Sequence, residues 1–180
     1  MRQKGAECPV IKKSFTQDCL YTAILRLMKE KDIDDITVRQ LVDKAGVSRS
    51  TFYRYYSQPI DVIQDYLRPF NQTNAYLEIQ SDEKAYLRRF YKYYAGNWEL
   101  IYYLIKVKKT EFLRDTITQH ILDVFSSIMD KDGNTLFQQK AIVGLCVEIL
   151  IIWVNNGRAD KIDEMTDTVH NLVSALKRVS

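Results

Sequence analysis

Residues 37–57 read TVRQLVDKAGVSRSTFYRYYS, and this stretch decides the fold. Thr37 lies three residues before Gln40, which is the spacing of a capping box, and Gly46 can end the helix that Thr37 opens. Ser48 follows at once and can cap a second helix. A further helix is expected over roughly 13–31. Helices joined by a tight glycine-centred turn predict a helix-turn-helix.

The two faces of this stretch differ in chemistry. Its apolar positions can all point into one small core; they are Val38, Leu41, Val42, Ala45, Val47, Phe52 and Tyr56. The other positions carry arginine, hydroxyl and tyrosine side chains, and Asp43 is the only acid of the segment. Arginine can bond guanine in a bidentate manner, hydroxyls reach phosphates, and free N–H groups at helix starts favour phosphate. A solvated basic face is the alternative interpretation, but caps, turn and face together favour DNA binding.

The rest of the sequence also has helical periodicity. The third helix is expected to end near Ser57, and Pro59 fits the first turn of the next helix. Asn97 can cap a helix that begins at Trp98, and Gly157 can close a long helix that starts near Thr135. We therefore predict an all-α protein of about nine helices.

The net charge of +3, from 26 Lys and Arg against 23 Asp and Glu, is low for a nucleic-acid binder, but it is unevenly distributed. Residues 1–68 carry 12 basic and 9 acidic residues, which gives 12 − 9 = +3, whereas residues 69–180 carry 14 of each. The whole surplus therefore lies in the half that contains the helix-turn-helix, where a local basic surface can form.

Several classes of function lack a sequence signal. With two histidines and three scattered cysteines, we expect no metal site, no disulfide framework and no histidine-based triad. No glycine-rich phosphate loop occurs, and we expect neither a cofactor nor enzymatic activity. The longest apolar stretch, Ala141–Val154, contains Glu148 and is short for a bilayer span, so we expect no membrane crossing. The scattered cysteines indicate reduced thiols, so we expect a cytoplasmic protein.

The segment from about Lys12 to Tyr66 resembles the DNA-binding domain of the TetR family of bacterial transcriptional regulators. The residues that match the family pattern are Thr37, Val38, Arg39, Leu41, Ala45, Gly46, Val47, Ser48, Arg49, Ser50, Thr51, Phe52 and Tyr53. The resemblance implies a DNA-binding domain over 10–57 and a helical effector-binding and dimerisation domain over 58–180. It also implies contacts with a double-stranded DNA operator from Thr37, Arg39, Ser48, Arg49, Ser50, Thr51, Tyr53 and Tyr55.

Two departures from the family pattern bear on DNA binding. Tyr55 and Tyr56 stand where the family often has His and Phe. Pro59 stands where the family usually has a phosphate-binding lysine. We therefore expect somewhat weaker non-specific DNA binding, and a Pro59→Lys variant whose binding had an unchanged salt dependence would contradict this.

The C-terminal part suggests a homodimer. The helix near 135–156 is apolar nearly all round and needs cover on two sides, and the resemblance makes it one of two dimerising helices. The expected interface residues are Ile149, Ile152, Trp153, Val169, Leu172 and Leu176. The alternative is the central helix of a monomeric bundle.

Eleven of the twelve tyrosines lie between Tyr53 and Tyr103, which suggests either an aromatic-lined effector pocket or simple helix packing. The pocket candidates are Tyr94, Trp98, Tyr102 and His120. The resemblance thus implies a repressor that a small-molecule effector releases from a palindromic operator. The alternative is a transcriptional co-activator whose C-terminal domain binds a partner protein.

Overall fold

The computed structural model describes residues 12–68, 82–129, 136–158 and 161–178, and it places side chains for all of these except 124–129, 136 and 176–178. These residues form nine α-helices and one 3-10 turn, with no strand among them, so the predicted all-α fold is confirmed. The helices are α1 (Phe15–Met28), η1 (Ile33–Asp35), α2 (Val38–Ala45), α3 (Arg49–Tyr53), α4 (Pro59–Tyr66), α6 (Glu83–Gly96), α7 (Trp98–Lys106), α8 (Thr110–Met129), α9 (Leu136–Asn155) and α10 (Ile162–Arg178).

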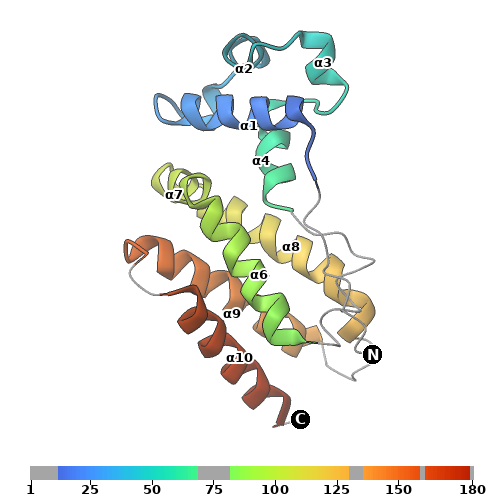
Figure 1. Cartoon of the computed structure of the whole chain (residues 1–180), viewed down its shortest axis with the longest axis vertical. Helices are drawn as coiled ribbons and strands as arrows, with labels where there is room; N and C mark the ends of the chain where they lie inside the picture. Colours follow the sequence, from blue (N-terminus) through green and yellow to red (C-terminus); the bar gives the residue numbers. More distant parts are fainter. Residues whose placement is uncertain (1–11, 69–81, 130–135, 159–160, 179–180) are drawn as a thin grey trace, which may run out of the picture.

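The molecule has a small helical unit at one end and a larger bundle at the other (Figure 1). In the small unit α2 and α4 pack on α1, and α3 packs on α2. Its core is formed by fully buried side chains from each of these helices, among them Leu20, Leu41, Phe52 and Val62. Burial of this apolar surface is what holds the four helices together, because three of them, α2, α3 and α4, have only five to eight residues and are not stable alone.

The helix starts of the small unit follow the sequence prediction. The Thr37 hydroxyl accepts a hydrogen bond from the Gln40 amide at 3.3 Å, and the Gln40 side chain accepts one from the Thr37 amide at 3.1 Å. This reciprocal pair is the predicted capping box. Pro59 lies in the first turn of α4, as its missing N–H favours.

Two predicted boundaries differ from the structure. Helix α3 ends at Tyr53, not near Ser57, because the Tyr55 amide turns back to the Phe52 carbonyl at 2.9 Å and Gln58 before Pro59 is extended. Asn97 precedes α7 but its side chain does not cap it. The Asn97 amide group donates instead to the Tyr93 carbonyl at 2.9 Å, so this side chain closes α6.

The larger unit is a bundle in which α9 packs against α7, α8 and α10, and α6 packs against α10 and α7. Helix α9 contributes Val143, Val147 and Leu150 to the core. By length and hydropathy alone, the stretch Phe137–Asn155 of α9 could cross a membrane, and half of that window is buried inside the protein. Its packing on three helices accounts for the apolar character.

Helix α4 lies between the two units (Figure 1). Its side chains pack on α1, while the carbonyls of Tyr66 and Leu67 at its C-terminal end accept hydrogen bonds from the Tyr93 and Tyr94 hydroxyls of α6, at 2.8 and 2.7 Å. The sequence-based domain limits of 10–57 and 58–180 place α4 with the second unit. The contacts show that α4 is bound to both.

Candidate DNA-binding surface

The turn between α2 and α3 depends on one glycine. Gly46 has φ +69° and ψ +29°, which is the left-handed region that side chains with a Cβ disfavour. The Val47 amide then bonds the Val42 carbonyl at 3.1 Å, which closes the end of α2. Ser48 follows as the cap of α3. The chain therefore passes from α2 into α3 through a tight turn of three residues, as the AGVS sequence predicts.

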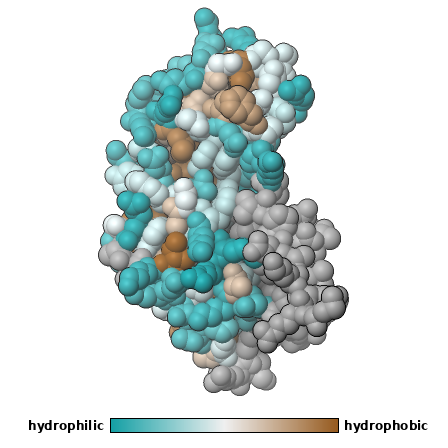
Figure 2. Space-filling model, viewed as in Figure 1, coloured by the Kyte–Doolittle hydropathy of each residue, from teal (hydrophilic) through white to brown (hydrophobic). Residues whose placement is uncertain are grey.

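The buried face of α2 and α3 fixes which side chains face outward. Leu41, Val42 and Phe52 are buried, and Val38, Ala45 and Val47 pack against them half-exposed. Because these residues occupy the inner face, the polar residues of both helices are left on the outside. In the space-filling view, hydrophilic and near-neutral residues surround a hydrophobic patch at the tip of the molecule that carries α2 and α3 (Figure 2).

The structure places the predicted DNA contacts on this outer surface. Seven of them are exposed: Thr37, Arg39, Ser48, Arg49, Ser50, Tyr53 and Tyr55. Thr51 is half-exposed. Arg49, Ser50 and Tyr53 all come from α3, whereas Arg39 comes from α2. The contacts themselves stay a prediction, but every one of these side chains has surface available for them.

Hydroxyl groups cluster at the start of α3. The Ser48 hydroxyl accepts a hydrogen bond from the Thr51 amide at 3.1 Å and lies 2.9 Å from the Ser50 hydroxyl and 2.8 Å from that of Thr51. The Ser48 cap therefore occupies the Thr51 amide, one of the helix-start amides that were expected to be free for phosphate. The Thr37 hydroxyl occupies the Gln40 amide at the start of α2 in the same way. Rotating hydroxyls can still donate to a phosphate oxygen.

The charged groups of the surface are only weakly engaged within the protein. The Arg39 guanidinium, 77% exposed, lies 3.8 Å from the Asp43 carboxylate, a surface pair of little strength. Arg54 lies over the ring of Tyr55 at 5.2 Å from its centre. A hydrogen bond with Ser14, together with the Arg54 charge, lowers the pKa of Tyr55. An acid-poor surface with weakly held arginines can bind a polyanion.

The start of α4 reinforces the effect expected from Pro59. The Asp61 carboxylate accepts hydrogen bonds from the Ser57 and Gln58 amides, at 2.8 and 2.9 Å. A carboxylate therefore occupies the amides that a phosphate could use at this turn. Sequence reasoning did not assign Asp61 a role, although a carboxylate in the first turn of a helix is a common partner of free amides.

The four predicted effector-pocket residues differ in their surroundings, and the rings of two of them, Trp98 and Tyr102, lie 6.2 Å apart. Tyr94 is fully buried and donates to the Leu67 carbonyl, and burial raises its pKa. The Arg158 guanidinium lies over the Trp98 ring, 3.7 Å from the centre of that ring. Tyr102, whose ring neighbours that of Trp98, is exposed. His120 is buried on α8. Packing explains Tyr94, and the pocket assignment of all four stays a prediction.

The predicted interface residues fall into two groups. Trp153 and Val169 are buried inside the chain itself, whereas Ile152 and Leu172 are 48% and 44% exposed. Ile149 is half-exposed, and the side chain of Leu176 lies outside the described residues. A groove between α9 and α10 is lined by Ile149, Ile152, Trp153, Glu164, Met165 and Thr168. An apolar rim is therefore present where a dimer was expected.

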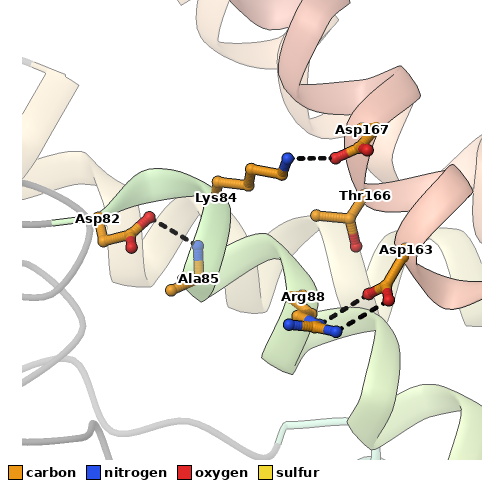
Figure 3. A pocket seen from close by; sticks show the side chains of 7 residues that line it. All are labelled: Asp82, Lys84, Ala85, Arg88, Asp163, Thr166 and Asp167. Atoms are coloured by element: carbon orange, nitrogen blue, oxygen red, sulfur yellow. Dashed lines mark hydrogen bonds and ion pairs between the residues drawn. The ribbon is translucent and has the colours of Figure 1, made fainter.

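A second hollow lies between α6 and α10 and is polar (Figure 3). Lys84 pairs with Asp167 at 2.6 Å, and Arg88 contacts the Asp163 carboxylate at 2.7 and 2.8 Å. These charges satisfy one another across the two helices. Within the described residues, no three His, Cys, Asp or Glu side chains gather as metal ligands would.

Known proteins are similar to this chain in the segment that carries the candidate DNA-binding surface. The family described as "Bacterial regulatory proteins, tetR family" matches residues 20–58, which include α2, the turn and α3. Over 50 residues, 28% of this chain, the sequence is 36% identical to an "Uncharacterized HTH-type transcriptional regulator YxbF" of Bacillus subtilis (strain 168). The match covers only 13% of that relative's length.

Solved structures show the same fold over nearly the whole chain. The "Dihydroxyacetone kinase operon activator DhaS" aligns with a TM-score of 0.63 and 15% identity, over 92% of this chain and 97% of its own. The fatty acid degradation regulator FadR from Bacillus halodurans aligns with a TM-score of 0.59 and 19% identity, over 90% and 96%. At such identities the likeness concerns the fold. The segment 20–58 is thus similar to the tetR family of bacterial regulatory proteins, and the chain as a whole shares its fold with these regulators.

Proposed function

We propose that this protein is a transcriptional regulator that binds double-stranded DNA through the outer surface of α2 and α3. The observation that carries the proposal is the acid-poor exposed face of these helices within the segment that matches the family. Arg39 and Tyr53 reach solvent from α2 and α3, and α3 would enter the major groove.

We further propose that two copies associate through α9 and α10. The exposed Ile152 and Leu172 and the groove beside Ile149 support this, because exposed branched apolar side chains gain free energy when a partner covers them. A two-fold dimer would present two α3 helices to half-sites about 34–36 Å apart, and a palindromic operator would match that symmetry.

Repression relieved by an effector is the final part of the proposal. The hydrogen bonds from α6 to the end of α4 support it, because a ligand that shifts α6 would also move the small unit. A hundredfold change in operator affinity needs only about 2.7 kcal/mol of coupling. A reporter gene with the operator in its promoter tests the direction: repression predicts that deletion of the regulator raises expression.

Selection of bound duplexes from a random pool tests DNA binding directly. The proposal predicts a palindromic consensus, and absence of enrichment at low salt would refute it. Arg39→Ala and Tyr53→Phe then test the assigned contacts. A base contact predicts relaxed preference at one position of each half-site, whereas a phosphate contact predicts a uniform loss of affinity and a smaller salt slope.

A further inference from the structure

One carboxylate joins three elements of the small unit. Asp65 of α4 accepts a hydrogen bond from the Tyr56 hydroxyl at 2.6 Å and one from the Gln17 side chain of α1 at 3.1 Å. Lys13, just before α1, forms an ion pair with the other carboxylate oxygen and donates to the Asp65 carbonyl at 3.0 Å. The Gln17 amide also donates to the Tyr56 oxygen at 3.2 Å. The residues of this group lie up to 52 positions apart in the sequence.

The group is partly shielded from water, which strengthens its bonds, although 28% of the Asp65 side chain is exposed. The Tyr56 side chain is buried and only 8% of the Lys13 side chain is exposed. Hydrogen bonds to a carboxylate are about twice as strong as neutral ones, and a lower local dielectric increases the difference. Burial, and next the bond to Asp65, raise the pKa of Tyr56, so its hydroxyl stays protonated and donates at neutral pH.

Tyr56 is tied directly to the helix that faces DNA. Its amide bonds the Phe52 carbonyl of α3 at 3.0 Å, and its ring lies 5.9 Å from that of Phe52. Helix α3 has five residues and cannot hold its own direction through internal bonds alone. Phe52 anchors it in the core, but one apolar anchor leaves rotation about that side chain possible. The Tyr56 hydroxyl supplies a second, directional attachment.

We propose that the Tyr56 hydroxyl, bound to Asp65, is a positioning group for DNA recognition that fixes the orientation of α3 on α1 and α4. This inference rests on the proposed function. Base readout needs side chains placed to a few tenths of an ångström, whereas phosphate attraction tolerates a tilt of the helix. Loss of the hydroxyl should therefore reduce discrimination between sequences more than it reduces general DNA affinity.

Tyr66 offers a matched control. Its hydroxyl donates to the Asp18 carboxylate at 2.5 Å, so it too is a buried tyrosine bound to an acid. This bond joins α4 to α1 and does not involve α3. If the Tyr56 bond only stabilised the small unit, Tyr56→Phe and Tyr66→Phe would have the same effect on DNA binding.

The experiment measures equilibrium binding of the full-length protein to a selected operator duplex and to a random-sequence duplex, at one salt concentration. We expect Tyr56→Phe to weaken operator binding about tenfold, the scale of one charge-assisted hydrogen bond, and random-sequence binding by less than twofold. Asp65→Asn should weaken operator binding at least as much, because it turns the Tyr56 bond into a neutral one and also removes the ion pair with Lys13. The double variant should bind the operator no more weakly than the weaker single variant, because the two substitutions act on one shared interaction. Tyr66→Phe should keep the wild-type ratio of operator to random-sequence affinity.

Circular dichroism and urea unfolding of each variant show whether a loss of DNA binding comes from a loss of folding or from a change in the orientation of α3. If either Tyr56→Phe or Asp65→Asn fails to fold, the binding ratio of the other variant tests the inference. Equal operator affinity of Tyr56→Phe and wild type would overturn this inference and leave the proposed function intact. An equal decrease in the ratio of operator to random-sequence affinity in Tyr66→Phe and Tyr56→Phe would also overturn it. Failure of the wild type to bind any duplex would overturn the proposed function and this inference with it.

Discussion

At the scale of single residues, Gly46 makes the turn possible. Its φ of +69° places it where an alanine is strained, although no atom lies within 4 Å of an added Cβ. We expect Gly46→Ala to lower the free energy of unfolding by about 1–2 kcal/mol through backbone strain alone. Urea unfolding followed by circular dichroism measures it.

Gly96, at the end of α6, provides the comparison for Gly46. It also has open space around an added Cβ, but its φ is not positive. Gly96→Ala should be neutral or stabilise by a few tenths of a kcal/mol. If both variants had the same stability, conformational strain at Gly46 would not be what the turn requires.

His120 makes a pH-dependent contribution to stability. Burial, and next the positive charge of Arg68, lower its pKa to about 4 from the ordinary 6.5. Between these pH values the unfolded chain binds a proton that the folded chain does not, so stability falls as the pH falls from about 6.5 to about 4. At pH 4.5 the lowered pKa of His120 reduces the free energy of unfolding by on the order of 2–3 kcal/mol relative to neutral pH.

The pH effect of His120 can be isolated with His120→Gln, which does not titrate. Urea unfolding at pH 7.0 and pH 4.5 should show a smaller loss of stability in the variant than in the wild type, by about 2 kcal/mol. The wild type at each pH serves as the control. Identical losses in the two proteins would show that the imidazole is not neutral in the folded state.

At the scale of elements, one acidic side chain on the outer face of α2, Asp43, opposes the binding of DNA. Asp43 is the only acid of residues 37–57 and lies 3.8 Å from Arg39. Asp43→Asn should remove repulsion of the phosphates and release Arg39, so that binding of a random-sequence duplex at low salt tightens roughly three- to tenfold. Fluorescence anisotropy measures this affinity.

The matched control for Asp43→Asn is Asp167→Asn on α10. Asp167 is also an exposed aspartate paired with a cation, Lys84, but α10 lies at the other end of the molecule from α2 (Figure 1). Its replacement should leave the DNA affinity within twofold of wild type. An equal gain from both variants would indicate a general effect of net charge.

Local signals allowed most elements to be predicted from the sequence. Caps and breakers act within three or four residues, and Thr37, Ser48 and Gly46 therefore marked helix ends correctly. Asn97 was assigned to the wrong helix because its partner, the Tyr93 carbonyl, competes from the preceding helix. A cap residue between two adjoining helices can serve either one.

The candidate site was predictable only in part, because sequence signals of this kind act between residues that are close in the chain. The helix-turn-helix is a local pattern, and its polar residues are exposed as the pattern indicates. The Asp65 group joins residues 9, 48 and 52 positions apart, and no spacing rule connects them. Tyr56, expected only as core, carries a hydroxyl whose partner becomes evident in three dimensions.

At the scale of the whole molecule, several polar contacts link the small unit to the bundle. Tyr21 of α1 donates to the Asn97 side chain at 2.9 Å, and Lys109 at the start of α8 pairs with Asp34 of η1 at 2.5 Å. With the α6 bonds to the end of α4, these contacts attach the small unit at three places. A change in the bundle can therefore alter the angle of the DNA-binding surface.

The proposed dimer makes a prediction at this scale. Ile152→Asp and Leu172→Asp each put a charge on the exposed rim of α9 and α10, and burial of an unpaired charge opposes association. We expect either variant to sediment as a monomer in analytical ultracentrifugation and to lose the tight binding that two linked half-sites give. Tyr102→Ser, which changes an equally exposed aromatic residue on α7, should remain dimeric. A wild type that sediments as a monomer would contradict the proposed interface.

The central claim is that the face formed by α2 and α3 binds DNA phosphates and bases, and the salt dependence of operator binding tests it most directly. The measurement is the slope of log affinity against log salt concentration for the wild type and for Arg49→Ala. Because Arg49 is exposed on α3, we predict that the variant binds more weakly and that its slope is smaller in magnitude by about 1 for each phosphate that the arginine neutralises in the wild type. Identical slopes and affinities in the two proteins would contradict the account.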